Sequence, residues 1–160
     1  MQFQTKFRDA IIRGLDSTFR QIIILGAGND SRFHRIPQLP FALIEVDAPK
    51  TQAAKLKMLT NCNSNVKFVP GDFECESWIQ NLGENGFQKD QKTLFLWEGV
   101  IYFLTPADIQ STLESISECA KGSKLVQDYL QAGRSQDRSP SRPLPATHAR
   151  PRRAVALPHD

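Results

Sequence analysis

Short, mainly apolar runs alternate with segments of helical periodicity along most of the chain. The apolar runs that we expect to form strands are residues 21–25, 41–46, 66–69 and 93–97, with a fifth beginning at 124–127. Runs of this length, rich in β-branched residues, are typical of strands buried on both faces of a parallel sheet. Helical patterns cover residues 7–15, 49–59, 76–82 and 106–120. Strands that alternate with helices predict an α/β fold with a doubly wound, mostly parallel sheet covered on both faces.

The composition divides the chain into two parts. The 160 residues are 40% hydrophobic, which suits one domain with a real core. From residue 131 on, six arginines and five prolines accompany two aspartates, so this segment carries +4 and residues 1–130 carry −1. A segment with almost no apolar periodicity cannot offset its ordering entropy. We therefore expect a domain of residues 1–130 and a disordered Arg/Pro-rich tail of residues 131–160.

The basic balance of the whole chain belongs to this tail, so the domain gives no reason to expect a nucleic-acid partner. For the tail itself, an uninformative extension from a truncated or frame-shifted gene is favoured over an RNA-binding arm. The reason is that no aromatic residues interleave with its arginines.

Membrane and secretion signals are not predicted. No stretch approaches the ~18 uninterrupted apolar residues of a membrane helix, and residues 1–8 lack an apolar signal core. Cys62, Cys75 and Cys119 are odd in number and form no CxxC pair. They indicate free thiols of a reducing compartment, with no metal site and no disulfide frame. Together these features predict a cytoplasmic protein without a membrane partner.

The loop after the first expected strand carries two glycines. Gly26 permits a tight turn with positive φ, and Gly28 lets a ligand approach the backbone closely, although glycine also serves plain turns. Ser31 stands where the dinucleotide fingerprint has its third glycine. This departure disfavours NAD, whose pyrophosphate needs a closely approached helix start. It favours a ligand without phosphates.

Acidic residues follow the next two strands, at the sheet edge where open parallel sheets bind ligands. Glu45 and Asp47 end the second strand and could accept hydrogen bonds from a ribose diol. One βαβ unit after a GxG loop, that role is favoured over a helix cap by Asp47. After the third strand, Asp72 and Phe73 could bind the amino group of adenine and cover its ring. A simple turn with Phe73 in the core is an equal alternative.

Glu98 ends the apolar run of the fourth expected strand. An unpaired carboxylate at this position would be costly. A cationic partner, such as the ammonium group of a ligand, would offset that cost. The less favoured alternative is that Glu98 caps a neighbouring helix.

These four loops together resemble the leucine carboxyl methyltransferase family, which belongs to the class I S-adenosylmethionine-dependent methyltransferases. The family pairs a LGAGxDTR-like loop with an EVDxP segment, a DL- or DF-type acid and an EGxxxYL(T/P)P stretch. Here they read LGAGNDSR, EVDAP, GDF and EGVIYFLTP, in that order. The resemblance covers roughly residues 4–130; one motif alone is weak, and the four together are fairly specific. It implies a Rossmann-like methyltransferase fold, truncated so that its C-terminal strands are incomplete.

The resemblance also implies S-adenosyl-L-methionine as the cofactor. The positions that it assigns to the cofactor are, for the methionine part, Gly26 and Gly28; for the ribose, Glu45 and Asp47, with Asp47 favoured; for adenine, Asp72 and Phe73; and for the amino end, Glu98. It assigns no catalytic residue, because the sulfonium is already an excellent leaving group. The protein mainly aligns the reactants.

Three features depart from the family pattern. Gln4 stands where the family has an arginine that anchors the cofactor carboxylate, and glutamine cannot form that charged bidentate pair. Phe103 stands where the family commonly has a tyrosine, and Tyr102 lies one position earlier. The helices and antiparallel strands that end the family fold give way to the tail, and the N-terminal helices on the substrate side are short or missing.

The sequence therefore predicts an S-adenosylmethionine-dependent methyltransferase that methylates an oxygen of a carboxylate. The expected acceptor is a small molecule or a protein C-terminal carboxylate. One alternative is a truncated, inactive relative that keeps the cofactor cradle. A less favoured alternative is an NAD-binding oxidoreductase with the same sheet topology.

Overall fold

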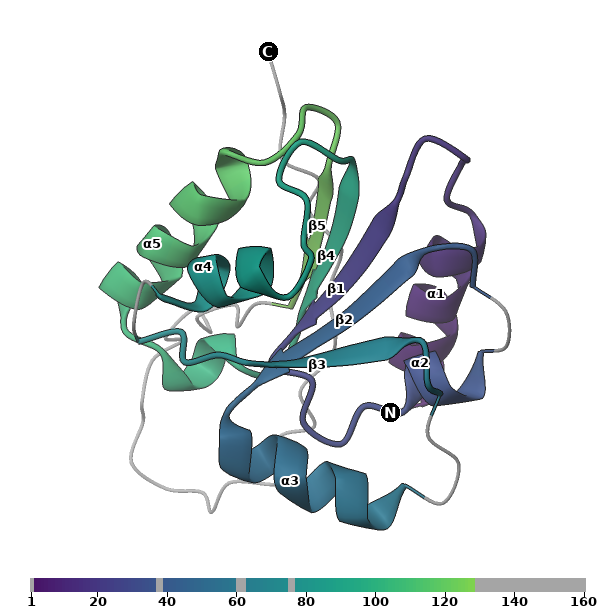
Figure 1. Ribbon diagram of the computed structural model, residues 1–160, viewed down its shortest axis with the longest axis horizontal. Coiled ribbons are helices and arrows are strands. Elements are labelled where there is room, and N and C mark those ends of the chain that lie inside the picture. Colours follow the sequence, from purple (N-terminus) through teal and green to yellow (C-terminus); the bar gives the residue numbers. More distant parts are fainter. Residues whose placement is uncertain (1, 37–38, 60–62, 75–76, 129–160) are drawn as a thin grey trace, which may run out of the picture.

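The computed structural model describes residues 2–36, 39–59, 63–74 and 77–128. Five parallel strands form one sheet in the order β3-β2-β1-β4-β5 (Figure 1). The strands are β1 Gln21–Leu25, β2 Ala42–Asp47, β3 Val66–Pro70, β4 Thr93–Trp97 and β5 Lys124–Gln127. The predicted α/β class, with a Rossmann-like parallel sheet, is confirmed. The predicted tail of residues 131–160 lies outside the described residues, so the division at residue 130 stays a prediction.

Helices cover both faces of the sheet (Figure 1). They are α1 Gln2–Arg13, α2 Arg32–Arg35, α3 Pro49–Met58, α4 Ser77–Glu84 and α5 Pro106–Ser117, with a short 3₁₀ helix, η1, at Ile101–Phe103. One core cluster joins alternate strand residues such as Ile23 to α4 and α5, and the other joins Ile22 and its neighbours to α1 and α2. The sequence predicts four of the helices but neither α2 nor η1, each of which is a single turn.

Hydrogen bonds at its two ends set the boundaries of α5. Thr105 caps its start: the Thr105 hydroxyl accepts a hydrogen bond from the Asp108 N–H, and the Asp108 carboxylate accepts one from the Thr105 N–H at 3.0 Å. The helix ends at Ser117, earlier than the predicted residue 120, because the Ala120 N–H leaves the helical pattern and donates to the Lys89 carbonyl at 2.8 Å.

The strand order reverses between β1 and β4. From β1 the chain builds outward through β2 to β3, then returns to the other side of β1 with β4 and β5. The last residues of β1 and β4, Leu25 and Trp97, are paired in register. The loops that follow them therefore leave from neighbouring points and turn toward opposite faces, which is where open α/β sheets form a ligand crevice. Among the helices described, none is long and apolar enough to span a bilayer.

Candidate functional site

Backbone hydrogen bonds join the loops at the carboxyl edge of the sheet. The N–H of Gly26 donates to the Val46 carbonyl at 2.8 Å, and the N–H of Gly71 donates to the Asp47 carbonyl at 3.0 Å. The segments after β1, β2 and β3 are thus held against one another. The edge brings together most of the residues that the sequence singles out, although these lie far apart along the chain.

The Asp47 carboxylate links the end of β2 to the glycine loop. Its Oδ2 accepts a hydrogen bond from the Gly28 N–H at 2.5 Å, and its Oδ1 accepts one from the Ala48 N–H at 2.7 Å. Ala48 itself is the N-cap of α3 and no side chain caps that helix, so the helix-cap alternative for Asp47 is not observed. Each carboxylate oxygen retains lone-pair capacity, and the side chain is only half-buried. Asp47 can therefore accept hydrogen bonds from ligand hydroxyls while it holds the loop.

The two glycines of the loop are required for different reasons. Gly26 has φ +71°, and a Cβ there would lie 1.8 Å from Cγ2 of Val100, so its site excludes any side chain. Gly28 has φ +46°, and a Cβ there would meet no atom within 4 Å. The space above Gly28 is thus open, and a ligand can approach the backbone at this point. This open surface beside a hydrogen-bonding carboxylate can accommodate a ligand that carries hydroxyl groups.

Glu45 lies two residues before Asp47 but has a different environment. Its side chain is 1% exposed and pairs with Lys55 Nζ at 2.5 Å and with His34 Nε2 at 3.4 Å. Burial raises the pKa of Glu45, and the hydrogen bond from Lys55 opposes that rise. Both carboxylate oxygens are directed at partners inside the fold. The geometry therefore favours Asp47 over Glu45 for the predicted ribose contact, and that contact stays a prediction.

His34 completes this buried cluster. Its Nδ1 accepts a hydrogen bond from the Asn63 N–H at 3.1 Å, which leaves the ring hydrogen of the neutral imidazole on Nε2, facing Glu45. The ring stacks on Phe68 with an interplanar angle of 7° and a centroid separation of 6.0 Å. Burial, and then the charge of Lys55, lower the pKa of His34. The sequence reasoning missed this cluster, whose members give no motif.

The residues after β3 divide between surface and core. Asp72 is exposed, and its Oδ1 accepts a hydrogen bond from the Glu74 N–H at 3.0 Å. Phe73 is buried, with its ring centroid 5.6 Å from that of Trp78 and 6.4 Å from that of Trp97. The ring of Phe73 thus lies in the core, as the turn alternative predicts. Of the pair, Asp72 is the side chain that an adenine amino group could reach.

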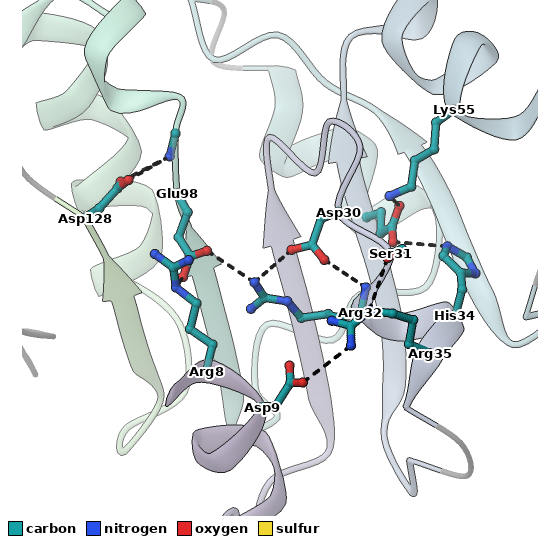
Figure 2. Close-up of polar contacts among 12 residues, drawn as sticks. Arg8, Asp9, Asp30, Ser31, Arg32, His34, Arg35, Lys55, Glu98 and Asp128 are labelled. Carbon is teal, nitrogen blue, oxygen red and sulfur yellow. Dashed lines mark hydrogen bonds and ion pairs between the residues drawn. The ribbon is translucent and has the colours of Figure 1, made fainter. Parts of the chain in front are cut away.

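Glu98 is the centre of an ion-pair network between the ends of β1 and β4, the position at which open α/β sheets have their ligand crevice and which we call the β1–β4 crevice. Arg32 Nη2 donates to Glu98 Oε2 at 3.3 Å and also pairs with Asp30 at 2.9 Å, while Arg8 Nε contacts Glu98 Oε1. Figure 2 shows the two arginines approaching the carboxylate from α1 and from the segment after β1. Burial raises the pKa of Glu98, and the charges of Arg32 and Arg8 oppose that rise. Glu98 therefore has cationic partners supplied by the protein itself, and its predicted contact with a ligand ammonium group stays a prediction.

The sequence reasoning missed both arginines. Arg32 stands inside the quoted LGAGNDSR string, so a search for a partner of Glu98 could have found it. Arg8 gives a weaker signal, because only its place one helical turn after Gln4 sets it apart. No amphipathic pattern marks an arginine that turns toward a site.

The other side of the crevice is formed by the segment after β4. The Gly99 N–H donates to both oxygens of the Asp128 carboxylate at 3.1 Å, which ties this segment to the end of β5. Burial, and then the hydrogen bond with Asp128, raise the pKa of Tyr102. The phenol is therefore protonated at neutral pH. Phe103, the neighbour of Tyr102 in η1, is an exposed large apolar side chain.

Metal and thiol chemistry have no support within the described ranges. In these ranges no group of three His, Cys, Asp or Glu side chains could hold a metal ion. Cys119 is a free, buried cysteine, and burial raises the pKa of its thiol to about 11. A thiol with that pKa is a poor nucleophile at neutral pH. Cys62 and Cys75 lie outside the described residues.

The sequence is similar to those of known proteins. The family described as leucine carboxyl methyltransferase matches residues 1–117. YktD of Bacillus subtilis strain 168, provisionally named an S-adenosyl-L-methionine-dependent methyltransferase, is 37% identical over 117 residues, which are 69% of this chain and 38% of YktD. A Mycolicibacterium vanbaalenii protein with the same provisional name is 32% identical over 130 residues, which are 78% of this chain and 44% of that protein. The chain thus spans about two fifths of the length of these curated relatives.

Solved structures share the fold at low identity. The glycopeptide N-methyltransferase MtfA complexed with S-adenosyl-L-methionine superposes with a TM-score of 0.56 and 18% identity, covering 89% of this chain and 61% of MtfA. The structure described as PigF with SAH gives a TM-score of 0.57 and 18% identity, covering 80% of this chain and 37% of PigF.

Proposed function

This chain belongs to the leucine carboxyl methyltransferase family, and from that premise we propose that it binds S-adenosyl-L-methionine and serves methyl transfer to a carboxylate oxygen. The observation that carries the proposal is the contact of Asp47 with Gly28 at 2.5 Å. In this contact the Asp47 carboxylate lies directly beside an open stretch of glycine backbone, which supports a role for Asp47 as the acceptor of ribose hydroxyls. The similarity of YktD, with its provisional name, supports the same cofactor.

Each part of the cofactor would meet a different loop. Asp47 would accept hydrogen bonds from the ribose hydroxyls, and the methionine part would lie over Gly28. The exposed carboxylate of Asp72 would accept a hydrogen bond from the adenine amino group, with no cover from the buried ring of Phe73. Glu98 would meet the ammonium group in the β1–β4 crevice. These contacts would fix the position of the sulfonium relative to the segment after β4.

The cofactor supplies a methyl group on a positively charged sulfur, which departs as a neutral thioether when the acceptor oxygen bonds to the methyl carbon. The protein's own part is to orient and enclose, because alignment of the reacting atoms can account for much of such a rate increase. A carboxylate acceptor is already ionised at neutral pH and needs no base. The description of the family as leucine carboxyl methyltransferase supports a carboxylate acceptor over a hydroxyl.

The oxidoreductase alternative loses support from the structure of the glycine loop. Ser31 is followed by α2, which is only 4 residues long and ends at Arg35. Dinucleotide folds bind their pyrophosphate at the start of a long helix, where aligned peptide dipoles favour the negative charge. A single turn provides little of that field, which agrees with a ligand that carries no phosphate.

Titration calorimetry on the full chain tests the proposal. The wild-type protein is expected to bind S-adenosyl-L-methionine and S-adenosylhomocysteine and to give no heat with NAD. Asp47→Ala should weaken binding by about 1–3 kcal/mol, the range for a lost buried charged hydrogen bond. Asp90→Ala is the matched control, because Asp90 is exposed in the turn before β4, at the amino ends of the strands and away from the candidate site. Equal affinity in Asp47→Ala and the control would refute the ribose assignment.

A second candidate is cofactor binding without methyl transfer. It is favoured by the coverage of the relatives, of whose length this chain spans 38% to 44%. A transfer assay with methyl-labelled cofactor and a panel of small carboxylates and peptide C-termini separates the two. Labelled methyl ester supports the transferase, whereas tight binding with no labelled product from any acceptor supports the second candidate.

A further inference from the structure

Two arginines share the Glu98 carboxylate, and they differ in how far they are committed to it. The side chain of Arg32 is 4% exposed, whereas those of Arg8 and Glu98 are 15% and 14% exposed. Arg32 also pairs with Asp30 at 2.9 Å, and its own backbone N–H donates to Asp30 Oδ1 at 2.8 Å. Arg32 is therefore held between the carboxylates of Asp30 and Glu98 and is almost inaccessible to solvent.

Arg8 has a looser position. Its contact with Glu98 uses Nε, and within the described part of the chain Glu98 is the acidic residue that it pairs with. A guanidinium carries two further nitrogens, whose N–H groups point the same way and match the two oxygens of a carboxylate. In Figure 2 the Arg8 guanidinium lies beside Glu98 on the side away from Asp30. It is the cation of this network that an incoming anion can reach.

The charges of the network match a zwitterion. Arg8 and Arg32 carry two positive charges, and Asp30 and Glu98 carry two negative charges, so the group is neutral. The amino-acid end of S-adenosyl-L-methionine is also neutral overall, with an ammonium and a carboxylate on one carbon. If its ammonium pairs with Glu98, its carboxylate is left in a half-buried crevice, where an unpaired charge is costly. A cation must then lie within reach of the same carbon.

We propose that Arg8 is this cation and anchors the carboxylate of the cofactor's methionine part; the proposal rests on the proposed function. In the free protein Arg8 pairs with Glu98. In the complex the zwitterion lies between them, with its ammonium on Glu98 and its carboxylate on Arg8, so every charge keeps a partner. The placement also accounts for Gln4, because Arg8 stands four residues after position 4 on the same helix, α1. The positive charge that Gln4 lacks stands one turn farther along.

The test compares S-adenosyl-L-methionine with its decarboxylated form, which lacks only the carboxylate. Calorimetry on the full chain is expected to show that Arg8→Gln weakens binding of S-adenosyl-L-methionine by about 10- to 100-fold, the range for a charged hydrogen bond. Binding of the decarboxylated ligand should change by less than about threefold. Arg13→Gln is the matched control, since Arg13 is exposed in the last turn of the same helix, and it should change neither affinity.

The outcomes are distinguishable from failure of the proposed function. Equal loss for both ligands in Arg8→Gln, or no loss for either, overturns the carboxylate role and leaves cofactor binding intact. A wild-type protein that binds neither ligand overturns both proposals. If circular dichroism shows that Arg8→Gln is unfolded, Arg8→Lys is the variant to test. It keeps the positive charge but lacks the paired N–H groups of a guanidinium. We then expect a loss of affinity for S-adenosyl-L-methionine alone. An equal loss for both ligands in Arg8→Lys overturns the inference.

Discussion

Gly26 and Val100 approach so closely that the loop after β1 and the segment after β4 leave no room for a side chain between them. A Cβ on residue 26 would lie 1.8 Å from Cγ2 and 3.0 Å from Cβ of Val100. This contact lies at the point where the strand order reverses. The shape of the crevice therefore depends on a hydrogen atom at position 26.

Replacing Gly26 by alanine is expected to lower the free energy of unfolding by about 2–5 kcal/mol. A left-handed residue other than glycine costs about 1–2 kcal/mol, and overpacking costs about 1–3 kcal/mol. Urea unfolding followed by the fluorescence of the buried Trp78 and Trp97 measures the change. In the Gly26→Ala background, Val100→Ala should restore the packing part of the loss only. A single variant as stable as the wild type would show that the contact is absent.

Gly28→Ala should separate stability from binding. Its φ of +46° costs about 1–2 kcal/mol for alanine, with no clash, because nothing lies within 4 Å. A ligand lying on the loop would meet the new methyl group, so the affinity for S-adenosylhomocysteine should fall by at least about tenfold. Gly122→Ala is the control: Gly122 has φ +85°, and its neighbour is the flexible side chain of Lys92. Gly122→Ala should lose a similar free energy of unfolding and keep its affinity for S-adenosylhomocysteine. If Gly28→Ala also kept its affinity, the ligand would have to bind away from Gly28.

Lys55→Met is expected to destabilise the fold by about 3–5 kcal/mol, because it leaves the Glu45 carboxylate buried without its cation. The two side chains are 4% and 1% exposed, and their charged atoms are 2.5 Å apart. Adding Glu45→Gln to Lys55→Met removes the stranded charge and should recover most of the loss. Chemical denaturation of the two single variants and the double variant gives the coupling energy. Additive losses would mean that the two groups do not interact.

His34 should make the fold sensitive to mild acid. Burial and the charge of Lys55 lower its pKa in the folded state, below the ordinary histidine value of 6.5. As the pH falls through that value, the unfolded chain gains a proton that the folded chain does not take up, so stability falls. Between about pH 7.5 and pH 5.5 the wild type should therefore lose more stability than His34→Gln. Parallel stability curves for the two proteins would show that His34 titrates alike in both states.

The fold could be predicted where burial alone decides structure. The two central strands, β1 and β4, are buried along their whole length, and such apolar runs have few alternatives in a small domain. The helix α3 is harder, because the residues that it buries against the sheet include Gln52 and Lys55. Gln52 satisfies the Val69 carbonyl at 2.8 Å, and Lys55 satisfies Glu45. Polar positions that turn inward to meet a partner cannot be told from solvated ones by periodicity.

For the candidate site, the sequence predicted which strand ends carry the acidic residues but not which side chains surround them. The carboxyl ends of parallel strands meet at one edge, so the order of strands along the sequence was enough to group Asp47, Asp72 and Glu98. The family resemblance favoured Asp47 over Glu45, but sequence reasoning could not give the physical reason, which is that the Lys55 and His34 side chains occupy the Glu45 carboxylate. Sequence reasoning could not find Arg8 either, since a helix pattern does not state which of its charged residues points at a neighbouring loop.

The contact of Arg32 with Glu98 joins residues 66 positions apart in the chain, whereas Lys55 and Glu45 are 10 apart. Long loops close at a greater entropic cost, so the distant pair forms only once β1 and β4 have docked. A ligand that bridges these two loops would thus stabilise contacts that are absent until late in folding. The bound cofactor should therefore change the kinetics of unfolding. It should slow the separation of β1 from β4 and leave the rate of folding almost unchanged.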